Sequence, residues 1–315
     1  MSQLSGLSKF GFLTTIRPLR EEEILNLGDI IRSVRPAQWT KNLFVFAALV
    51  FARQALAERA VLRTAAAFAV FCLLSGAMYL LNDLHDAAED RRHPKKARRP
   101  IAAGRITPAQ AVTLSALFGA ASLAAAYFLG GPFFAVCAAY AVLQIVYTWK
   151  LKNVVILDIF IIAAGFVLRV AAGASVIDVP VSSWLLICTT LLALFVAMGK
   201  RRHEIVLLEG AAPDHRPILR EYSAYLLDQM ISVVTASTLI AYCLYTVSEE
   251  TVQKFGTENL IYTMPFVLYG IFRYLYLVHQ KGQGGSPEEL VVKDKPLAAS
   301  ILLWIAAVAL ILYAL

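Results

Sequence analysis

Long apolar stretches, separated by short polar connections, are the feature of this sequence that most limits its fold. Nine stretches are apolar enough to cross a bilayer as helices, which takes about 20 residues each. They run approximately over 38–56, 63–84, 107–129, 132–149, 154–177, 181–200, 224–247, 259–279 and 297–315. The chain is only 16% charged, whereas a soluble domain is about 25% charged. The sequence therefore predicts an all-α, polytopic membrane protein with nine transmembrane helices.

The distribution of lysine and arginine predicts how the chain is oriented. The connections after the second, fourth, sixth and eighth spans are basic, whereas those after the third and fifth carry no Lys or Arg. Basic connections remain on the cytoplasmic side, so we expect the N-terminus inside and the C-terminus outside the cell membrane. The first connection, with Arg53, Arg59 and Arg63, runs mildly against this assignment. Because the net charge of +7 is spread over these connections, it does not indicate nucleic-acid binding.

Residues 1–35 and 36–315 are expected to form two parts of the chain. In the first part, Ile24, Leu27, Ile31 and Val34 lie on one side of a helix that is too polar to cross the bilayer. This pattern predicts an amphipathic helix on the cytoplasmic membrane surface. Residues 36–315 then form a single transmembrane catalytic domain. The oligomeric state is not fixed by the sequence, and a homo-oligomer stays open.

An acidic run at the end of the second span carries the strongest chemical signal. On a helix, Asn82, Asp83, Asp86 and Asp90 fall on one face over about two turns. Carboxylates on one face repel one another unless a cation binds among them, and oxygen ligands suit Mg²⁺. The run therefore predicts a Mg²⁺ site, with Asp83 and Asp86 as the candidate catalytic residues. The alternative is a solvated acidic helix end that the following basic loop balances.

Other polar residues gather at the cytoplasmic ends of the spans. We expect these ends to form one chamber open to the cytoplasm, where Arg and Lys around a carboxylate-bound cation suit a diphosphate leaving group. The candidate substrate contacts are Arg35, Lys41, Asn42, Arg98, Arg99, Tyr147, Lys150, Lys200, Arg201 and Glu204. Topology alone would also place basic residues in the loop of Arg98 and Arg99. Lys152 and Arg202 are attributed to topology only.

Arg169 is a further candidate substrate contact, within the fifth span. It lies 11 residues beyond Asp158, about 16 Å along a helix, and therefore near the centre of the bilayer. A charge at that depth is costly and usually functional. The alternative is a structural ion pair with an acid on another helix.

The acidic run also resembles a family motif. Asn82-Asp83-x-x-Asp86-x-x-x-Asp90, at the end of the second of nine spans, resembles the first Asp-rich motif of the UbiA-type intramembrane prenyltransferases. The resemblance implies nine helices around a central cavity, with Mg²⁺-bound diphosphate near the cytoplasmic face and a lateral opening for lipid. Typical members carry a second Asp-rich motif after the sixth helix. Here that place holds Gly199-Lys200-Arg201-Arg202-His203-Glu204.

This departure indicates a particular branch of the family. The segments that are similar to the polyprenyl-phosphate phosphoribosyltransferase branch are Arg35-Pro36-x-Gln38-Trp39-x-Lys41-Asn42, the acidic run through Arg99-Pro100-Ile101-Ala102-Ala103-Gly104, Leu168-Arg169-x-x-Ala172-Gly173 and Gly199-Lys200-Arg201-x-x-Glu204. The likeness implies Mg²⁺-dependent transfer of the 5-phosphoribosyl group of 5-phosphoribosyl diphosphate to a long-chain polyprenyl phosphate, with release of diphosphate. A site for three phosphate-bearing groups should hold more cations and fewer carboxylates, as observed here.

Two alternatives to this function are kept. The first is a UbiA-type enzyme that transfers a prenyl group from a prenyl diphosphate to an aromatic acceptor, although the missing second Asp-rich motif weighs against it. The second is a cation transporter that uses the acidic cluster. Transport sites tend to use broken helices at the bilayer midplane, whereas this cluster lies at a helix end, so the transporter is disfavoured.

Overall fold

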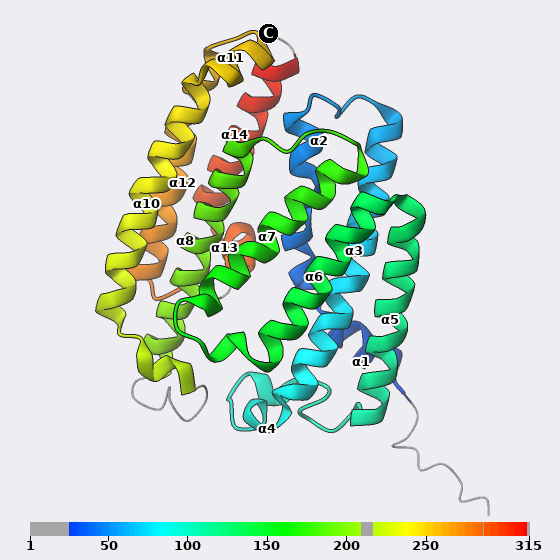
Figure 1. Cartoon of the computed structure of the whole chain (residues 1–315). Coiled ribbons are helices and arrows are strands. Elements are labelled where there is room, and N and C mark those ends of the chain that lie inside the picture. The colour runs from blue at the N-terminus through cyan, green and yellow to red at the C-terminus, as the bar shows by residue number, and fades with distance from the viewer. Residues whose placement is uncertain (1–24, 209–216, 286, 314–315) are drawn as a thin grey trace, which may run out of the picture.

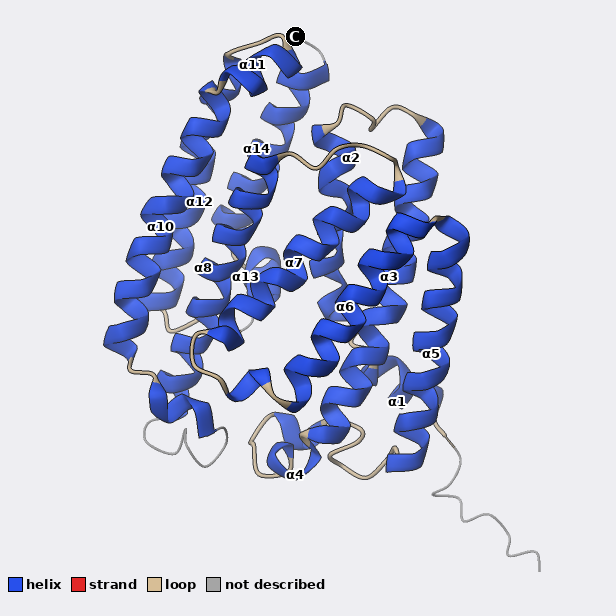
Figure 2. Ribbon diagram, viewed as in Figure 1, coloured by secondary structure: helices blue, strands red, loops and turns tan. Residues whose placement is uncertain are grey.

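The computed structural model describes residues 25–208, 217–285 and 287–313, and over these residues the chain is helical, without strands (Figure 1, Figure 2). The predicted all-α class is confirmed for this part of the chain. In chain order, with η marking 3₁₀ helices, the elements are α1 (Leu27–Ser33), η2 (Pro36–Phe46), α2 (Ala47–Phe51), α3 (Glu58–His85), α4 (Ala87–Asp90), η3 (Lys96–Arg98), α5 (Pro108–Leu129), α6 (Gly131–Trp149), η4 (Leu151–Asn153), α7 (Leu157–Val176), α8 (Ser183–Leu208), η5 (Pro217–Glu221), α10 (Ala224–Val247), α11 (Glu249–Phe255), η6 (Asn259–Thr263), α12 (Met264–His279), α13 (Pro287–Lys293) and α14 (Lys295–Tyr313).

Eight helices in the described ranges are long and apolar enough to cross a membrane. They correspond to the last eight predicted spans, with η6 and α12 together forming the eighth of the nine. The largest difference in a boundary is at α8, which continues to Leu208 rather than ending near residue 200. The basic segment that begins at Gly199 therefore lies on a helix.

The first predicted span, 38–56, is not one continuous α-helix, so nine long helices are not confirmed. Residues Pro36–Phe46 form the 3₁₀ helix η2, which leads directly into the short α2. A 3₁₀ helix rises about 2.0 Å per residue, compared with about 1.5 Å in an α-helix. The 11 residues of η2 and the 5 of α2 therefore cover about 30 Å, which is the thickness of the hydrocarbon core of a bilayer.

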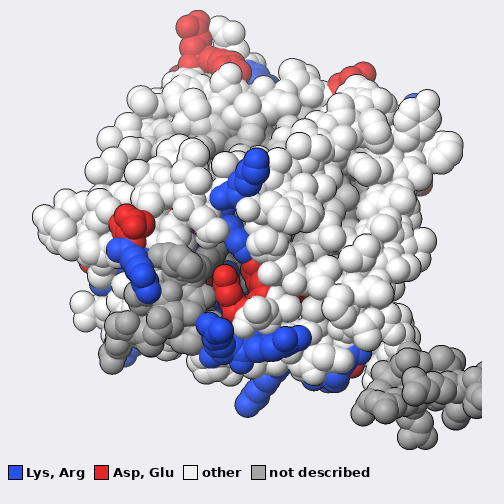
Figure 3. All heavy atoms as spheres, turned by 60° about the horizontal axis from the view of Figure 1, so that its bottom comes forward, with Lys and Arg blue, Asp and Glu red and all other residues white. Residues whose placement is uncertain are grey.

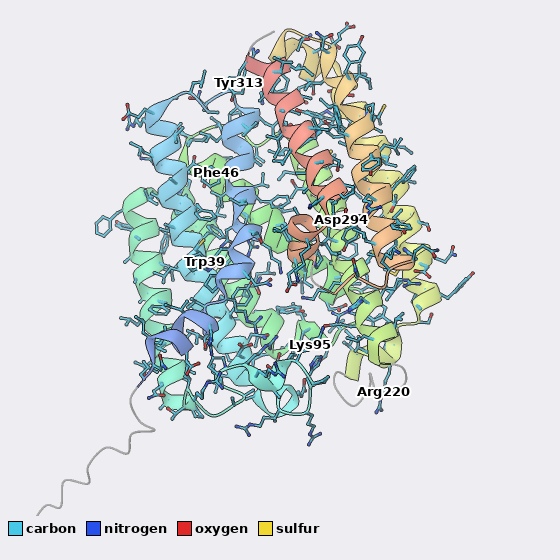
Figure 4. All side chains as sticks on the ribbon, turned by 180° about the vertical axis from the view of Figure 1, so that it is seen from behind. Trp39, Phe46, Lys95, Arg220, Asp294 and Tyr313 are labelled. Atoms are coloured by element: carbon cyan, nitrogen blue, oxygen red, sulfur yellow. The ribbon has the colours of Figure 1, made fainter. Side chains whose placement is uncertain are left out.

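The two described ends of the chain lie at opposite ends of the bundle (Figure 1). The chain begins beside α1 and α4, and η2 and α2 lead from there to the end where α11 lies. In the view from behind, Trp39 and Phe46 lie at successive heights along this segment (Figure 4). This arrangement agrees with an odd number of crossings, while the side of the membrane on which each end lies stays a prediction.

The predicted amphipathic helix is only partly described, because residues 1–24 lie outside the described ranges. α1 falls within its predicted extent, and two of the predicted apolar residues, Leu27 and Ile31, are 69% and 49% exposed. The division at residue 35 into a surface segment and a catalytic domain stays a prediction.

The helix α7 lies at the centre of the packing. One side of it contributes Ile159 and Phe166 to a core shared with α8, α10 and α12. Its other side contributes Ala172 and Val176 to a core shared with α3 and α6. Gly173 is required for the contact with η2, because a Cβ there would lie 1.9 Å from the carbonyl oxygen of Val45. The absence of a side chain at Gly173 thus brings η2 directly against the backbone of α7.

A pair of charges fixes the start of α14. Arg273 of α12 donates two hydrogen bonds to Asp294, with lengths of 3.1 and 2.8 Å. The side chain of Asp294 also accepts from the amide of Leu297. These hydrogen bonds, led by the one from Arg273, hold the pKa of Asp294 below its usual value. Figure 4 shows Asp294 part-way along the bundle rather than at either end.

Candidate active site

The acidic run lies at the end of the bundle that also carries α1 (Figure 1). It forms the last turn of α3, the capping residue Asp86 and the short helix α4. The backbone continues almost helically through Asp86, because its amide donates to the carbonyl of Asn82 at 2.9 Å and its carbonyl accepts from Asp90 at 2.8 Å. The side chains on the predicted face form two pairs, Asp83 with Asp90 and Asn82 with Asp86.

Asp83 and Asp90 are buried and converge on Arg99. Nη1 of Arg99 donates to Asp83 at 3.0 Å and to Asp90 at 2.6 Å, and the two carboxylate side chains are 2% and 4% exposed. Arg35 forms a second ion pair with Asp83, and its guanidinium lies 4.8 Å from the centre of the Tyr79 ring. Two arginines therefore neutralise the buried carboxylates.

Asp86 is neutralised by Lys152, a residue that the sequence analysis attributed to topology alone. Lys152 lies on η4, its side chain is 6% exposed, and it forms an ion pair with Asp86. Asn82 donates to the same carboxylate at 3.1 Å. Attributing Lys152 to topology is therefore wrong, because it is buried against the acidic run. In the sequence, only the position of Lys152 in the connection nearest the predicted chamber could have indicated this role. The exposed Lys150 lies in the same connection, so that position does not distinguish the two lysines.

The donor set of the acidic run fits a Mg²⁺ ion. One cationic nitrogen of Arg99 already lies between Asp83 and Asp90, so these two carboxylates can share a cation. Over the described residues, no group of three His, Cys, Asp or Glu side chains could hold a metal ion. Mg²⁺ often binds one or two carboxylates and takes its other ligands from water and substrate phosphates. Two converging carboxylates meet that need, while the four-residue ligand set stays a prediction.

A second buried network joins α7, α8 and η5. Asp158, which is fully buried, forms an ion pair with Arg201 and accepts a hydrogen bond of 2.7 Å from the hydroxyl of Tyr222. Arg201 also donates to Glu204 at 2.8 Å. Burial and the hydrogen bond to Asp158 raise the pKa of Tyr222 to about 12, so this hydroxyl stays a donor at neutral pH. Sequence reasoning missed Tyr222, which lies in a connection without a recognisable motif.

The remaining predicted contacts differ in how far they are exposed. Arg98 and Lys150 are exposed, whereas Tyr147 and Lys200 are half-buried. The ammonium of Lys41 donates to Gln38 one 3₁₀ turn earlier. Figure 3 shows Lys and Arg side chains around a small group of acidic atoms near the middle of this face. This face therefore combines exposed cations with buried, neutralised carboxylates.

Arg169 lies apart from this group, in the interior of the bundle. It is 4% exposed and donates to Asn42 at 2.7 Å, to the carbonyl of Gly165 at 2.7 Å and to the hydroxyl of Tyr140 at 3.0 Å. No carboxylate in the described ranges forms an ion pair with it. The alternative of a structural ion pair is therefore wrong for these residues. That Arg169 and Asn42 contact substrate stays a prediction.

Comparisons with known proteins agree with this arrangement. A family model described as the UbiA prenyltransferase family matches residues 42–288. The chain is 34% identical over 298 residues to decaprenyl-phosphate phosphoribosyltransferase of Mycolicibacterium smegmatis, covering 91% of this chain and 93% of that protein. It is 31% identical over 287 residues to the protein of the same name from Mycobacterium tuberculosis, covering 90% and 93%.

Solved structures show a similar fold. A UbiA homolog from Archaeoglobus fulgidus bound to GPP and Mg²⁺ matches with a TM-score of 0.69 and 20% identity, covering 90% of this chain and 99% of that one. The same homolog bound to DMAPP and Mg²⁺ matches with a TM-score of 0.68 and 20% identity, covering 91% and 100%.

Proposed function

Since this chain belongs to the UbiA prenyltransferase family, we propose that it transfers the 5-phosphoribosyl group of 5-phosphoribosyl diphosphate to a long-chain polyprenyl phosphate. In this reaction the bond from the anomeric carbon to the diphosphate breaks, and a bond from that carbon to a lipid phosphate oxygen forms. The names of relatives that match over nine-tenths of this chain support the proposal. The observation that carries it is the basic segment of α8, where Arg201 is bound to Asp158 in place of a second acidic cluster.

We place Mg²⁺ at the acidic run, with Asp83 and Asp90 as its protein ligands and Asn82 and Asp86 beside them. A bound Mg²⁺ would act as a Lewis acid that neutralises the leaving diphosphate. The structures of the Archaeoglobus fulgidus homolog, which is bound to Mg²⁺ together with GPP or DMAPP, support the use of this metal in the family.

The cations around the acidic run are the proposed phosphate contacts. Arg98 and Lys150 are exposed and accessible to a soluble donor, and Lys41 and Lys200 extend the basic surface. The half-buried Tyr147 is a proposed contact to the sugar. Because the lipid phosphate is an anion at neutral pH, the reaction needs no strong general base. Positioning and charge stabilisation would supply most of the catalysis.

We place the polyprenyl chain along an apolar groove of about 450 Å³ between α6, α7 and α8. The groove is lined by Ala139, Leu143, Phe160, Ala164, Val167, Leu168 and Thr190. Its α6 and α7 walls lead toward η4, because Leu143 lies seven residues before Lys150 and Phe160 lies two after Asp158, and Lys152 of η4 is paired with Asp86. An apolar wall that ends near basic side chains suits a lipid with a phosphate head group.

The orientation and location follow from the same proposal. The end of the bundle with the acidic run would face the cytoplasm of a cell membrane, because the basic connections after α3, α6 and α8 gather there. A soluble sugar diphosphate would then reach the site from the cytoplasm, and the lipid would arrive from the bilayer.

The proposed function is tested by measuring the mass of the lipid product. Purified protein is incubated in detergent with Mg²⁺, 5-phosphoribosyl diphosphate and a polyprenyl phosphate, and lipids are analysed by mass spectrometry. We expect the lipid mass to increase by one phosphoribosyl group, diphosphate to be released, and both to stop with EDTA. Asp83→Asn should be inactive, whereas Asp228→Asn, which alters an Asp–Arg pair outside the acidic run, should remain active. Product only from a prenyl diphosphate and an aromatic acid would refute the proposal.

A further inference from the structure

One amide side chain, that of Asn42, joins three elements, η2, α3 and α7, in the interior of the bundle. Its oxygen accepts from Nε of Arg169 on α7 at 2.7 Å. Its nitrogen donates to Cys72 and Ser75 on α3, at 3.3 and 3.2 Å. Asn42 itself is completely buried on η2. The position of η2 between α3 and α7 therefore depends on this side chain and on Arg169.

The contacts between η2 and α7 stay in register because a 3₁₀ helix and an α-helix advance by different distances per residue. Asn42 and Val45 are three residues apart on η2, and they contact Arg169 and Gly173, which are four residues apart on α7. Three residues of a 3₁₀ helix and four residues of an α-helix both advance by about 6 Å. If residues 36–46 were α-helical, Val45 would lie about 1.5 Å short of its contact and about 60° around the helix. Both contacts therefore require the 3₁₀ conformation.

The guanidinium of Arg169 is held by protein groups on all three of its nitrogens. All three of its nitrogens donate to oxygen atoms of the bundle, and the rings of Tyr140 and Phe166 lie 4.9 and 5.5 Å from its carbon. Long runs of 3₁₀ helix are uncommon, because their hydrogen bonds have poorer geometry than those of an α-helix. A buried, charge-assisted hydrogen bond to η2 supplies a force that favours the 3₁₀ form.

We propose that Arg169 is a positioning residue, which holds η2 in the 3₁₀ conformation through Asn42 and so aligns Arg35 and Lys41 with the acidic run. In a 3₁₀ helix, side chains three residues apart lie in one row. Gln38 and Lys41 form such a row, in which Lys41 donates to Gln38, and Arg35, the residue that caps η2, is paired with Asp83. The inference deepens the proposed function, since it explains how one side of the candidate site is placed.

In this positioning role Arg169 and Asn42 do not contact substrate, which differs from their predicted role as substrate contacts, and Asn42→Asp distinguishes the two roles. The carboxylate preserves an acceptor for Arg169, so we expect the KM values for 5-phosphoribosyl diphosphate and for polyprenyl phosphate to stay within two-fold of wild type. If Arg169 bound a substrate phosphate, the new carboxylate would compete with it. A ten-fold or larger rise in either KM would therefore overturn the inference.

Arg169→Met tests the positioning role directly. We expect kcat to fall at least ten-fold with both KM values within two-fold, and the double variant with Asn42→Ala to be no worse than the poorer single variant. Additive losses would overturn the inference. Ser115→Ala, which removes a buried hydroxyl that bonds Ala77 between α5 and α3, is the matched control and should leave kcat unchanged.

Hydrogen–deuterium exchange gives a measurement that does not depend on activity. In Arg169→Met, exchange at residues 37–46 should increase relative to α5, whereas Asn42→Asp should leave it near wild type. Unchanged exchange at 37–46 in Arg169→Met would overturn the inference. If wild-type protein transfers no phosphoribosyl group, the proposed function fails, and exchange still decides the role of Arg169. If Arg169→Met does not fold, Asn42→Asp decides it.

Discussion

Replacing Gly173 with alanine would place a methyl carbon against the backbone of η2. The added carbon would lie 1.9 Å from the carbonyl oxygen of Val45, whereas ordinary contacts begin at 3.4 Å. To relieve the overlap, α7 and η2 would have to separate by about 1.5 Å. Such a shift would also break the hydrogen bond from Arg169 to Asn42, which measures 2.7 Å. The substitution therefore disturbs two contacts between η2 and α7, Val45 with Gly173 and Asn42 with Arg169.

The expected cost combines these two effects. Overpacking costs about 1–3 kcal/mol and loss of a hydrogen bond to a charged group about 1.5–3 kcal/mol, so the free energy of unfolding should fall by about 3–5 kcal/mol. At about 2 °C or more per kcal/mol, the apparent midpoint of thermal unfolding in detergent should fall by about 6–10 °C.

Gly119→Ala on α5 is the matched control for this experiment. A Cβ at Gly119 would meet its nearest neighbour at 4.0 Å. Replacing a glycine inside a helix by alanine stabilises by up to about 1 kcal/mol, so this variant should unfold at or above the wild-type midpoint. Equal midpoints for the two alanine variants would refute the packing of η2 on α7 described above.

Three further predictions concern other parts of the molecule. Lys152→Met should lower the free energy of unfolding by about 3 kcal/mol and reduce transfer in the product assay, because it leaves the carboxylate of Asp86 without its cation. The control Lys150→Met, at an exposed lysine, should unfold like wild type. The pKa of Asp294 is lowered in the folded protein, so its carboxylate contributes stability that is lost as the pH falls through that lowered value. Asp294→Asn should therefore lower the unfolding midpoint at pH 7, and the difference from wild type should shrink below about pH 4. Ala164→Trp, in the groove, should raise the KM for a long-chain lipid phosphate but not the KM for the sugar diphosphate. The control Ala125→Trp, on the exposed face of α5, should raise neither KM. Equal effects of the two substitutions would contradict the assignment of the groove to the lipid.

The long helices and the depth of Arg169 are the features that sequence reasoning predicts well. A bilayer requires about 20 apolar residues per helix, so the eight long helices follow from the lengths of the apolar stretches. Counting along one helix from Asp158 places Arg169 in the interior, where it is found. Its partners do not follow in the same way, because amide, hydroxyl and carbonyl acceptors leave no charge pattern in the sequence. The ion pair expected from electrostatics alone is absent over the described residues for that reason.

The 3₁₀ conformation of η2 and the role of Lys152 lie beyond single-sequence reasoning. Gln38, Trp39 and Asn42 share one side of an α-helix as well, so their spacing does not separate the two helix types. The deciding contact is with Gly173, which is far away in the sequence. Lys150 and Lys152 belong to the same connection, and only the turn of η4 buries one of them against the acidic run. Both outcomes depend on tertiary contacts.

The length of the first crossing has a consequence for the membrane in which this protein works. α3, with 28 residues, is about 42 Å long and can meet thinner or thicker bilayers by changing its tilt. η2 and α2 together cover only about 30 Å and have no excess length with which to do so. Hydrophobic mismatch would therefore act on the segment that follows Arg35 and carries Lys41, as it would on α6 and α14, which at 19 residues each are about 28 Å long. A thick bilayer would thus strain the side of the candidate site that Arg35 and Lys41 form.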